Sequence, residues 1–250
     1  MSSVGTQPSI GTALVVSTDA SAIAQVSESL RQLAMSAEVY AESAQALQVL
    51  ARRKFEAVLV DLRLGEGATR VLEQVRLSSS NRTAVTFAIS ASKEEAGAAF
   101  KSGSTFVLQR PLTPEAVSLM LKASYGMIVR EKRRYFRYPV VVPATIEPRE
   151  EPQLSGETVN ISECGIALSL PVQLKAGVEG TVQFALPDFE SPVKAESRVC
   201  WSNEKGQAGF LFLSLPAEQA LELQEWLSRK LEQQLPESVA EKFRRTRGTS

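Results

Sequence analysis

Short apolar runs alternate with helix-like patterns along the first half of the chain. The apolar runs of strand length cover residues 13–16, 37–40, 55–60, 84–89 and 105–108. Between them, apolar residues recur three or four positions apart, which is the spacing of an amphipathic helix. Short apolar strands that alternate with helices predict a parallel sheet covered by helices on both faces. We therefore expect five βα units, wound doubly about one sheet, over residues 12–129.

A long helix is predicted at the end of this half. Thr113 is a good N-cap, Pro114 suits the first helical position and Glu115 suits the first turn. The helix is expected to run from Pro114 to about Arg130. A dense basic segment, 130–137, follows it.

The pattern of apolar and polar residues changes from Tyr138 onward. Apolar residues now sit in strand-length runs separated by Pro, Gly, Asn and Ser, over 140–147, 155–161, 165–170, 180–185, 193–202 and 208–213. Six short strands at this spacing predict a small β-barrel or sandwich. An amphipathic helix is expected over 216–231. The second domain is therefore predicted to span residues 130–235.

Both ends of the chain are predicted to be tails. Residues 1–11 are small and polar and are expected to be disordered, and residues 236–250 are expected to form a flexible basic tail. The N-terminal segment has no basic residue and no apolar run, so it is not a signal peptide. No apolar stretch approaches the roughly 18 residues of a membrane span. These features predict a cytoplasmic protein.

Composition excludes several kinds of chemistry. The 250 residues carry 28 basic and 28 acidic side chains, so the net charge favours neither nucleic acid nor membrane as a partner. The absence of histidine excludes a Ser-His-Asp triad, a His-ligated metal and a phosphohistidine relay within the chain. Cys164 and Cys200 are far apart in sequence and are predicted to be reduced core residues. We expect no catalytic activity, no metal and no cofactor.

Three arginines within five residues, Arg133, Arg134 and Arg137, create a site of high positive potential. Guanidinium groups bond bidentately to phosphate oxygens and to the O6/N7 edge of guanine, and they stack on purine rings. A basic run after a helix is also typical of a solvated linker.

A second cluster, Asn160, Ser162 and Gly165, reads NxSxxG and is predicted to lie in a turn between two strands. There an amide and a hydroxyl can face a base edge, and glycine allows a close backbone approach or a positive φ. The same pattern also occurs as a purely structural Asx or Ser turn.

The two clusters together, in this order and separation, resemble the PilZ family, which pairs RxxxR with (D/N)xSxxG. The likeness covers about Lys132 to Leu231, and the stretches 199–202 and 206–210 resemble the family's last strand pair. It implies a six-stranded PilZ-type barrel with a C-terminal helix that binds cyclic di-GMP. The residues that it implies as ligand contacts are Arg133, Arg134, Arg137, Asn160, Ser162 and Gly165.

The first half resembles a response-regulator receiver domain, which implies a flavodoxin-like (βα)5 fold. Asp61 ends the third predicted strand, where that family keeps its phospho-accepting aspartate, and Ser90 ends the fourth. Arg110 stands where the family has a lysine. Ser17 and Thr18 replace the acidic pair that would hold Mg²⁺, a cation that prefers several anionic oxygens. We therefore predict a pseudo-receiver in which Asp61 is a structural carboxylate paired with Arg110.

The function expected from these features is that of a bacterial cyclic di-GMP effector or signalling adaptor. Nucleotide binding would order the Arg133–Arg137 segment against the barrel and reorient it relative to a non-phosphorylatable receiver-like domain, which would alter binding of an unidentified protein partner. Homodimerisation is compatible with the sequence, and nucleic acid is not an expected partner. The alternative is a phosphorylation-dependent two-component response regulator with Asp61 as phospho-acceptor.

Overall fold

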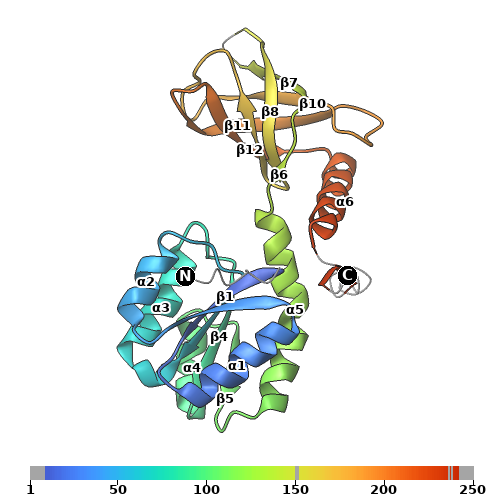
Figure 1. Ribbon diagram of the computed structural model, residues 1–250. Coiled ribbons are helices and arrows are strands. Elements are labelled where there is room, and N and C mark those ends of the chain that lie inside the picture. The colour runs from blue at the N-terminus through green and yellow to red at the C-terminus, as the bar shows by residue number, and fades with distance from the viewer. Residues whose placement is uncertain (1–8, 150–151, 236, 238, 242–250) are drawn as a thin grey trace, which may run out of the picture. The chain divides into compact units, whose positions relative to one another are not determined.

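The computed structural model describes residues 9–149, 152–235, 237 and 239–241 (Figure 1). The chain forms two compact units: the first ends at Lys132 and also includes the described residues from Leu235 onward, and the second is Arg133–Gln234. This boundary lies slightly beyond the predicted one, between residues 129 and 130, because the helix that contains it is longer than predicted.

The first unit contains a five-stranded parallel sheet in the order β2-β1-β3-β4-β5. This strand order defines the flavodoxin-like fold, as the sequence predicted. The central strands are almost wholly buried, which explains why they are apolar on both faces. Their bounds are β1 Gly11–Val16, β2 Met35–Tyr40, β3 Ala57–Asp61, β4 Val85–Ser90 and β5 Phe106–Gln109.

Helices cover both faces of this sheet, with α1 and α5 on one side and α2 and α3 on the other (Figure 1). Their bounds are α1 Ala20–Gln32, α2 Ser43–Leu50, the 3₁₀ turn η1 Leu62–Leu64, α3 Glu66–Leu77, α4 Lys93–Lys101 and α5 Pro114–Tyr135. Each helix buries an apolar stripe against the sheet, and that burial is the main source of helix stability in proteins.

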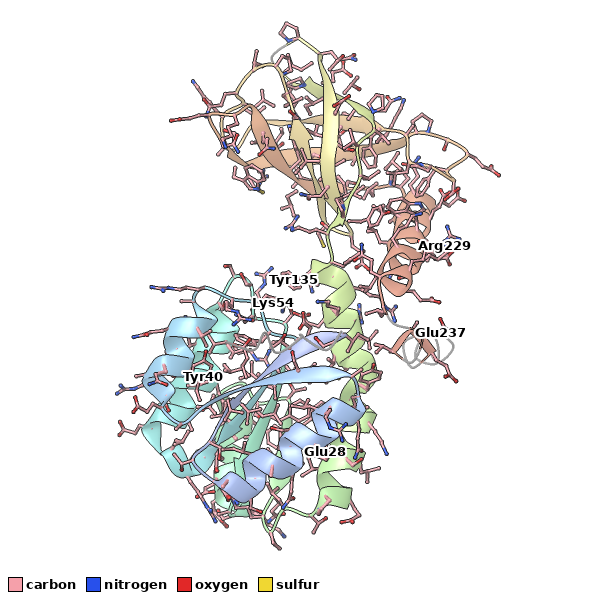
Figure 2. The ribbon with its side chains drawn as sticks, viewed as in Figure 1. Glu28, Tyr40, Lys54, Tyr135, Arg229 and Glu237 are labelled. Atoms are coloured by element: carbon pink, nitrogen blue, oxygen red, sulfur yellow. The ribbon has the colours of Figure 1, made fainter. Side chains whose placement is uncertain are left out.

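Helix α5 runs past its predicted end near Arg130 and stops at Tyr135, which Figure 2 labels. Glu131 explains the extension. Its carboxylate is buried, accepts a hydrogen bond from the Thr83 hydroxyl at 2.7 Å and pairs with the ammonium of Lys54. These contacts hold the penultimate turn of α5 within the first unit, so the helix continues into residues that the sequence assigned to the basic segment.

The second unit is a closed antiparallel barrel of six strands, in which β8-β7-β10-β11-β12-β9 closes through pairing of β9 with β8. A short strand, β6, pairs with β8 in addition. The predicted strand over 140–147 corresponds to β7, which begins later than predicted, and β6 precedes it as a strand that the sequence did not predict. The bounds are β6 Tyr138–Pro139, β7 Pro143–Pro148, β8 Leu154–Ser162, β9 Gly165–Ser169, β10 Glu179–Phe184, β11 Val193–Ser202 and β12 Gln207–Ser214.

Alternating side chains fill the barrel and form a single apolar core. Helix α6, Ala217–Gln233, adds Leu223, Trp226 and Leu227 to this core, and all three are buried. The Trp226 ring meets Tyr138 edge-to-face with their centroids 5.3 Å apart. Tyr138 belongs to β6, so this contact helps to hold the start of the barrel in place.

The two predicted tails are shorter than expected. Ile10 is buried, its backbone N–H donates to the Ala34 carbonyl at 2.7 Å, and Gly11 begins β1, so the prediction of disorder is wrong for these two residues. Val239 and Ala240 are helical and buried, which contradicts a flexible tail at that point. Most of the other predicted tail residues lie outside the described part of the chain. Across the described residues, no helix has both the length and the apolar character that a membrane crossing requires.

Candidate functional site

The barrel brings the two sequence motifs together through one strand pairing. In the antiparallel ladder between β6 and β8, Tyr138 lies opposite Ile161 and Pro139 lies opposite Asn160. Arg137 directly precedes Tyr138 and Ser162 directly follows Ile161, and both residues line the same cavity. The last arginine of RxxxR and the serine of NxSxxG are therefore neighbours, although 25 positions separate them in the sequence.

An open cavity of about 160 Å³ lies on the barrel at this point. Arg137, Ser162 and Gly165 line it, so one residue of the arginine motif and two of the second motif share a single cavity. Strands β9, β11 and β12 supply the rest of the lining, which is Cys164, Ile166, Ala167, Cys200, Trp201, Gly209, Phe210 and Leu211. The cavity thus joins one cationic group to a largely apolar wall, a combination that suits a flat anionic ligand.

Asn160 and Ser162 lie in the last residues of β8, so the prediction that they lie in the turn is wrong. The turn consists of Glu163 and Cys164. The Ser162 hydroxyl is buried and donates to the Gly165 carbonyl at 3.0 Å, which closes the turn. The structural role that the sequence left open for NxSxxG is therefore real at Ser162.

Asn160 has an unsatisfied polar atom. Its side-chain oxygen is buried and has no hydrogen-bond partner among the residues that the structure describes, although Asn160 does not line the cavity. Leaving such an atom unpaired costs about 1–3 kcal/mol. A buried polar group without a partner is a candidate for a ligand or water contact.

Gly165 packs so closely against the neighbouring strand β12 that no side chain fits at this position. A Cβ at this position would lie 2.2 Å from the Phe210 carbonyl oxygen on β12. Its φ lies outside the left-handed region, so close approach of a neighbouring strand, and not a positive φ, requires glycine here.

The other two arginines that were predicted as ligand contacts do not lie at the cavity. Arg133 and Arg134 belong to the last turn of α5, and neither lines the cavity. Consecutive helical residues point about 100° apart, so the helix directs these two side chains differently from each other. The backbone N–H of Phe136 donates to the Arg133 carbonyl at 3.1 Å where the helix ends. Among the three arginines, Arg137 is the one that the fold places in the cavity.

Trp201 is a site residue that the sequence did not single out as a contact. Strand β11 alternates buried and exposed residues up to Val199, and then both Cys200 and Trp201 face outward. The cause is a β-bulge, because Val199 pairs with Phe210 and Trp201 pairs with Gly209, which leaves Cys200 as an extra residue. The Trp201 side chain consequently lies on the outer surface, and the residue is 47% exposed.

The indole of Trp201 lies against the backbone of Gly209. A Cβ on Gly209 would come within 2.1 Å of the indole nitrogen, so the ring occupies the space that any other residue would fill. This packing fixes an exposed aromatic ring at the wall of the cavity. A planar, rigid surface of this kind can stack on a base.

Both cysteines of the chain are exposed and line this cavity, which contradicts their predicted place in the core. Cys164 belongs to the β8–β9 turn. Cys200 faces outward because it continues the alternation of buried and exposed residues along β11.

The receiver-like landmarks of the first unit also converge, at the carboxyl edge of its sheet. Arg110 Nη2 lies 2.7 Å from Asp61 Oδ2, and its Nη1 lies 2.6 Å from Asp19 Oδ2. The Ser17 hydroxyl donates to Asp61 Oδ2 at 2.8 Å. Asp61 is therefore a buried carboxylate paired with Arg110, as predicted.

Asp19 also stabilises the start of helix α1. It caps α1 by accepting hydrogen bonds from the backbone of Ser21 and Ala22. The hydrogen bond from the Ala22 N–H and then that from Arg110 hold the pKa of the Asp19 carboxyl below its usual value. The lowered pKa means that Asp19 stabilises the fold above its unfolded pKa, and this contribution is lost as the pH falls through the folded value.

Ser90, at the end of β4, is turned toward its own loop. Its hydroxyl is buried and donates to the Ser92 carbonyl at 2.6 Å. Within the described residues, no group of three or more Cys, Asp or Glu side chains is placed to hold a metal ion.

Fold and site together define a two-domain protein, with a flavodoxin-like α/β unit followed by a closed six-stranded barrel that carries a cationic cavity. Residues 131–229 match the family model described as the PilZ domain, so this part of the chain is a PilZ domain. No curated protein matches the chain.

The first unit is similar to solved receiver structures. The receiver domain of the sensor histidine kinase PA1611 from Pseudomonas aeruginosa PAO1 is 19% identical, with 45% of this chain and 95% of that chain covered and a TM-score of 0.41. A putative response regulator from Chloroflexus aurantiacus is 20% identical, with 48% and 98% covered and a TM-score of 0.43. The chemotaxis response regulator CheY4 of Vibrio cholerae is 21% identical, with 45% and 96% covered and a TM-score of 0.41.

Proposed function

We propose that this protein is a cyclic di-GMP-binding signalling protein without catalytic activity, and that the cavity beside Arg137 is its nucleotide site. The observation that carries this proposal is the β6–β8 pairing, which sets Arg137 beside Ser162 in one cavity. A guanidinium group can hold a phosphate or the O6/N7 edge of guanine there. The unpaired oxygen of Asn160 is an acceptor that a guanine amino group can satisfy.

The route from binding to response is proposed to run through the end of α5. The segment that the sequence expected to become ordered on binding is already helical as far as Tyr135. Glu131 fixes the helix within the first unit, while Arg133 and Arg134 begin the second. If Arg133 joins Arg137 at the nucleotide, the last turn of α5 must rearrange. That rearrangement would change the orientation of the two units and the surface offered to a protein partner.

The test is a calorimetric titration of the full chain with cyclic di-GMP, with cyclic di-AMP and GTP as controls. We expect saturable binding of cyclic di-GMP and much weaker binding of both controls, because adenine lacks the O6 acceptor and GTP offers one base. Equal affinity for the two cyclic dinucleotides would contradict guanine recognition. The absence of any binding would remove the proposed function.

Trp201 is expected to stack on one base of the nucleotide. Trp201→Ala should weaken binding by ~1–3 kcal/mol, about 5- to 150-fold, the usual contribution of a base stacked on an aromatic ring. Trp226→Phe leaves Trp201 as the sole indole, so its fluorescence reports on the cavity alone. We expect cyclic di-GMP to quench this emission. An unchanged emission at saturation, together with an unchanged affinity of Trp201→Ala, would exclude the stacking role.

The phosphorylation-dependent alternative makes the opposite prediction about Asp61. Arg110 and Ser17 already occupy the carboxylate, and Ser17 stands where a metal-binding acid is needed. We expect no acyl phosphate on Asp61 after treatment with acetyl phosphate and Mg²⁺, measured by intact mass and by borohydride trapping. A receiver domain with its acidic pair serves as the positive control. A clear phosphoryl adduct at Asp61 would support the alternative.

A further inference from the structure

Both cysteines of this chain lie in the cavity that we assign to the nucleotide. Free cysteine is among the most frequently buried residue types, yet Cys164 and Cys200 are both exposed. Cys164 belongs to the β8–β9 turn, and Cys200 belongs to the outward-facing side of β11. Their shared position is therefore a product of the barrel and not of sequence proximity.

We propose that Cys164 and Cys200 form a thiol-modification site that controls access to the cavity, an inference that rests on the proposed function. The reagent is a small anionic disulfide of the glutathione disulfide type. A cysteine thiolate attacks one sulfur of that disulfide, a protein–glutathione disulfide forms, and the original sulfur–sulfur bond breaks. The departing glutathione thiolate takes up a proton from water, so no other oxidant is required.

The surroundings of the thiols suit this reagent. Arg137 lines the same cavity, and a guanidinium group attracts the carboxylates of glutathione. Exposure beside a cationic group is the usual setting of reactive cysteines, whereas buried cysteines are inert. Cys200 Sγ has one weak contact, at 3.8 Å from the Arg198 carbonyl, so little holds the side chain in place.

We expect modification and nucleotide binding to exclude each other, because both would occupy the same wall of the cavity. The volume of the cavity is about 160 Å³. A glutathionyl group is a whole tripeptide with two carboxylates, so an adduct on either thiol would take up this space and would pair with Arg137. A bound nucleotide would in turn cover the thiols.

The experiment treats the reduced full chain with glutathione disulfide, with and without saturating cyclic di-GMP, and locates adducts by peptide mass mapping. We expect adducts on Cys164, Cys200 or both in the folded chain, and at least about tenfold slower modification when nucleotide is bound. The purified adduct should bind cyclic di-GMP at least about tenfold more weakly, and a reductant should restore the affinity. In the double variant Cys164→Ser/Cys200→Ser, treatment should leave the affinity at that variant's own starting value.

Two results would overturn the modification site. One is the absence of adduct in the folded chain under conditions that modify the urea-unfolded chain. The other is an adduct that binds cyclic di-GMP as tightly as the reduced protein does. If the reduced, untreated chain binds no cyclic di-GMP, the proposed function fails separately. In that case the presence of adduct in the folded chain supports the modification site, and its absence overturns the site.

Discussion

Arg137→Ala is expected to weaken cyclic di-GMP binding by about 10- to 150-fold, because it removes a charge-assisted hydrogen bond worth ~1.5–3 kcal/mol. Among Arg133, Arg134 and Arg137, Arg137 is the one that lines the cavity. Its side chain is exposed, so the substitution should leave thermal unfolding of the barrel nearly unchanged. Calorimetric titration measures the affinity, and calorimetric scanning confirms the fold.

Two control variants separate geometry from charge. Arg198→Ala makes the same change of charge on β11, where Arg198 pairs with Glu179 at 2.6 Å outside the cavity, and should leave the affinity unchanged. Arg137→Lys keeps the charge but loses the planar fork, so an intermediate affinity is expected. Equal affinities for wild type and Arg137→Ala would show that the nucleotide binds elsewhere.

Arg110→Ala is expected to destabilise the first unit by about 3–5 kcal/mol, because it leaves a buried charge without its partner. The Asp61 side chain is 1% exposed and that of Arg110 is 13% exposed, so water cannot replace the lost guanidinium. The same substitution also removes a partner of Asp19. Hydrogen exchange of peptides from β1 and β3 measures the effect within this unit, since both tryptophans of the chain belong to the second unit.

The comparison with Arg63 isolates burial as the cause. Arg63 also pairs with Asp19, at 3.2 Å, but its side chain is 57% exposed, and Arg63→Ala should cost no more than ~1 kcal/mol. The double variant Arg110→Ala/Asp61→Asn should recover much of the stability lost in Arg110→Ala, because the uncompensated charge is gone. Equal losses for Arg110→Ala and Arg63→Ala would contradict the structural role assigned to the Asp61–Arg110 pair.

The two predictions address different halves of the switch that we propose. The Asp61–Arg110 pair stabilises the receiver-like unit with protein groups alone, in the place where phosphoryl chemistry would otherwise occur. The cavity beside Arg137 supplies the chemistry for a small anionic ligand. If both predictions hold, the signal enters through the barrel, and the first unit serves as the responding or docking partner.

Local sequence determined the elements and their class. Apolar runs and helix spacing predicted every strand of the first sheet within a few residues, because buried strands and amphipathic helices have distinct periods. Residue identity also led to the prediction that the first unit is not phosphorylated, because Ser17 and Thr18 stand where an acidic pair would bind Mg²⁺. It further predicted the pairing of Arg110 with Asp61, which the structure contains. These properties depend on residue identity and on strand ends, which are visible along the chain.

Tertiary structure decided which side chains share the cavity. Strict alternation along β11 would have turned Trp201 into the barrel, and the bulge at Cys200, which exists only in the pairing with β12, turned it outward. The buried contacts of Glu131 carried Arg133 and Arg134 into a helix that the basic sequence did not predict. Cross-strand register and long-range burial depend on partners distant in sequence, so no local pattern could reveal the cysteine and tryptophan wall of this site.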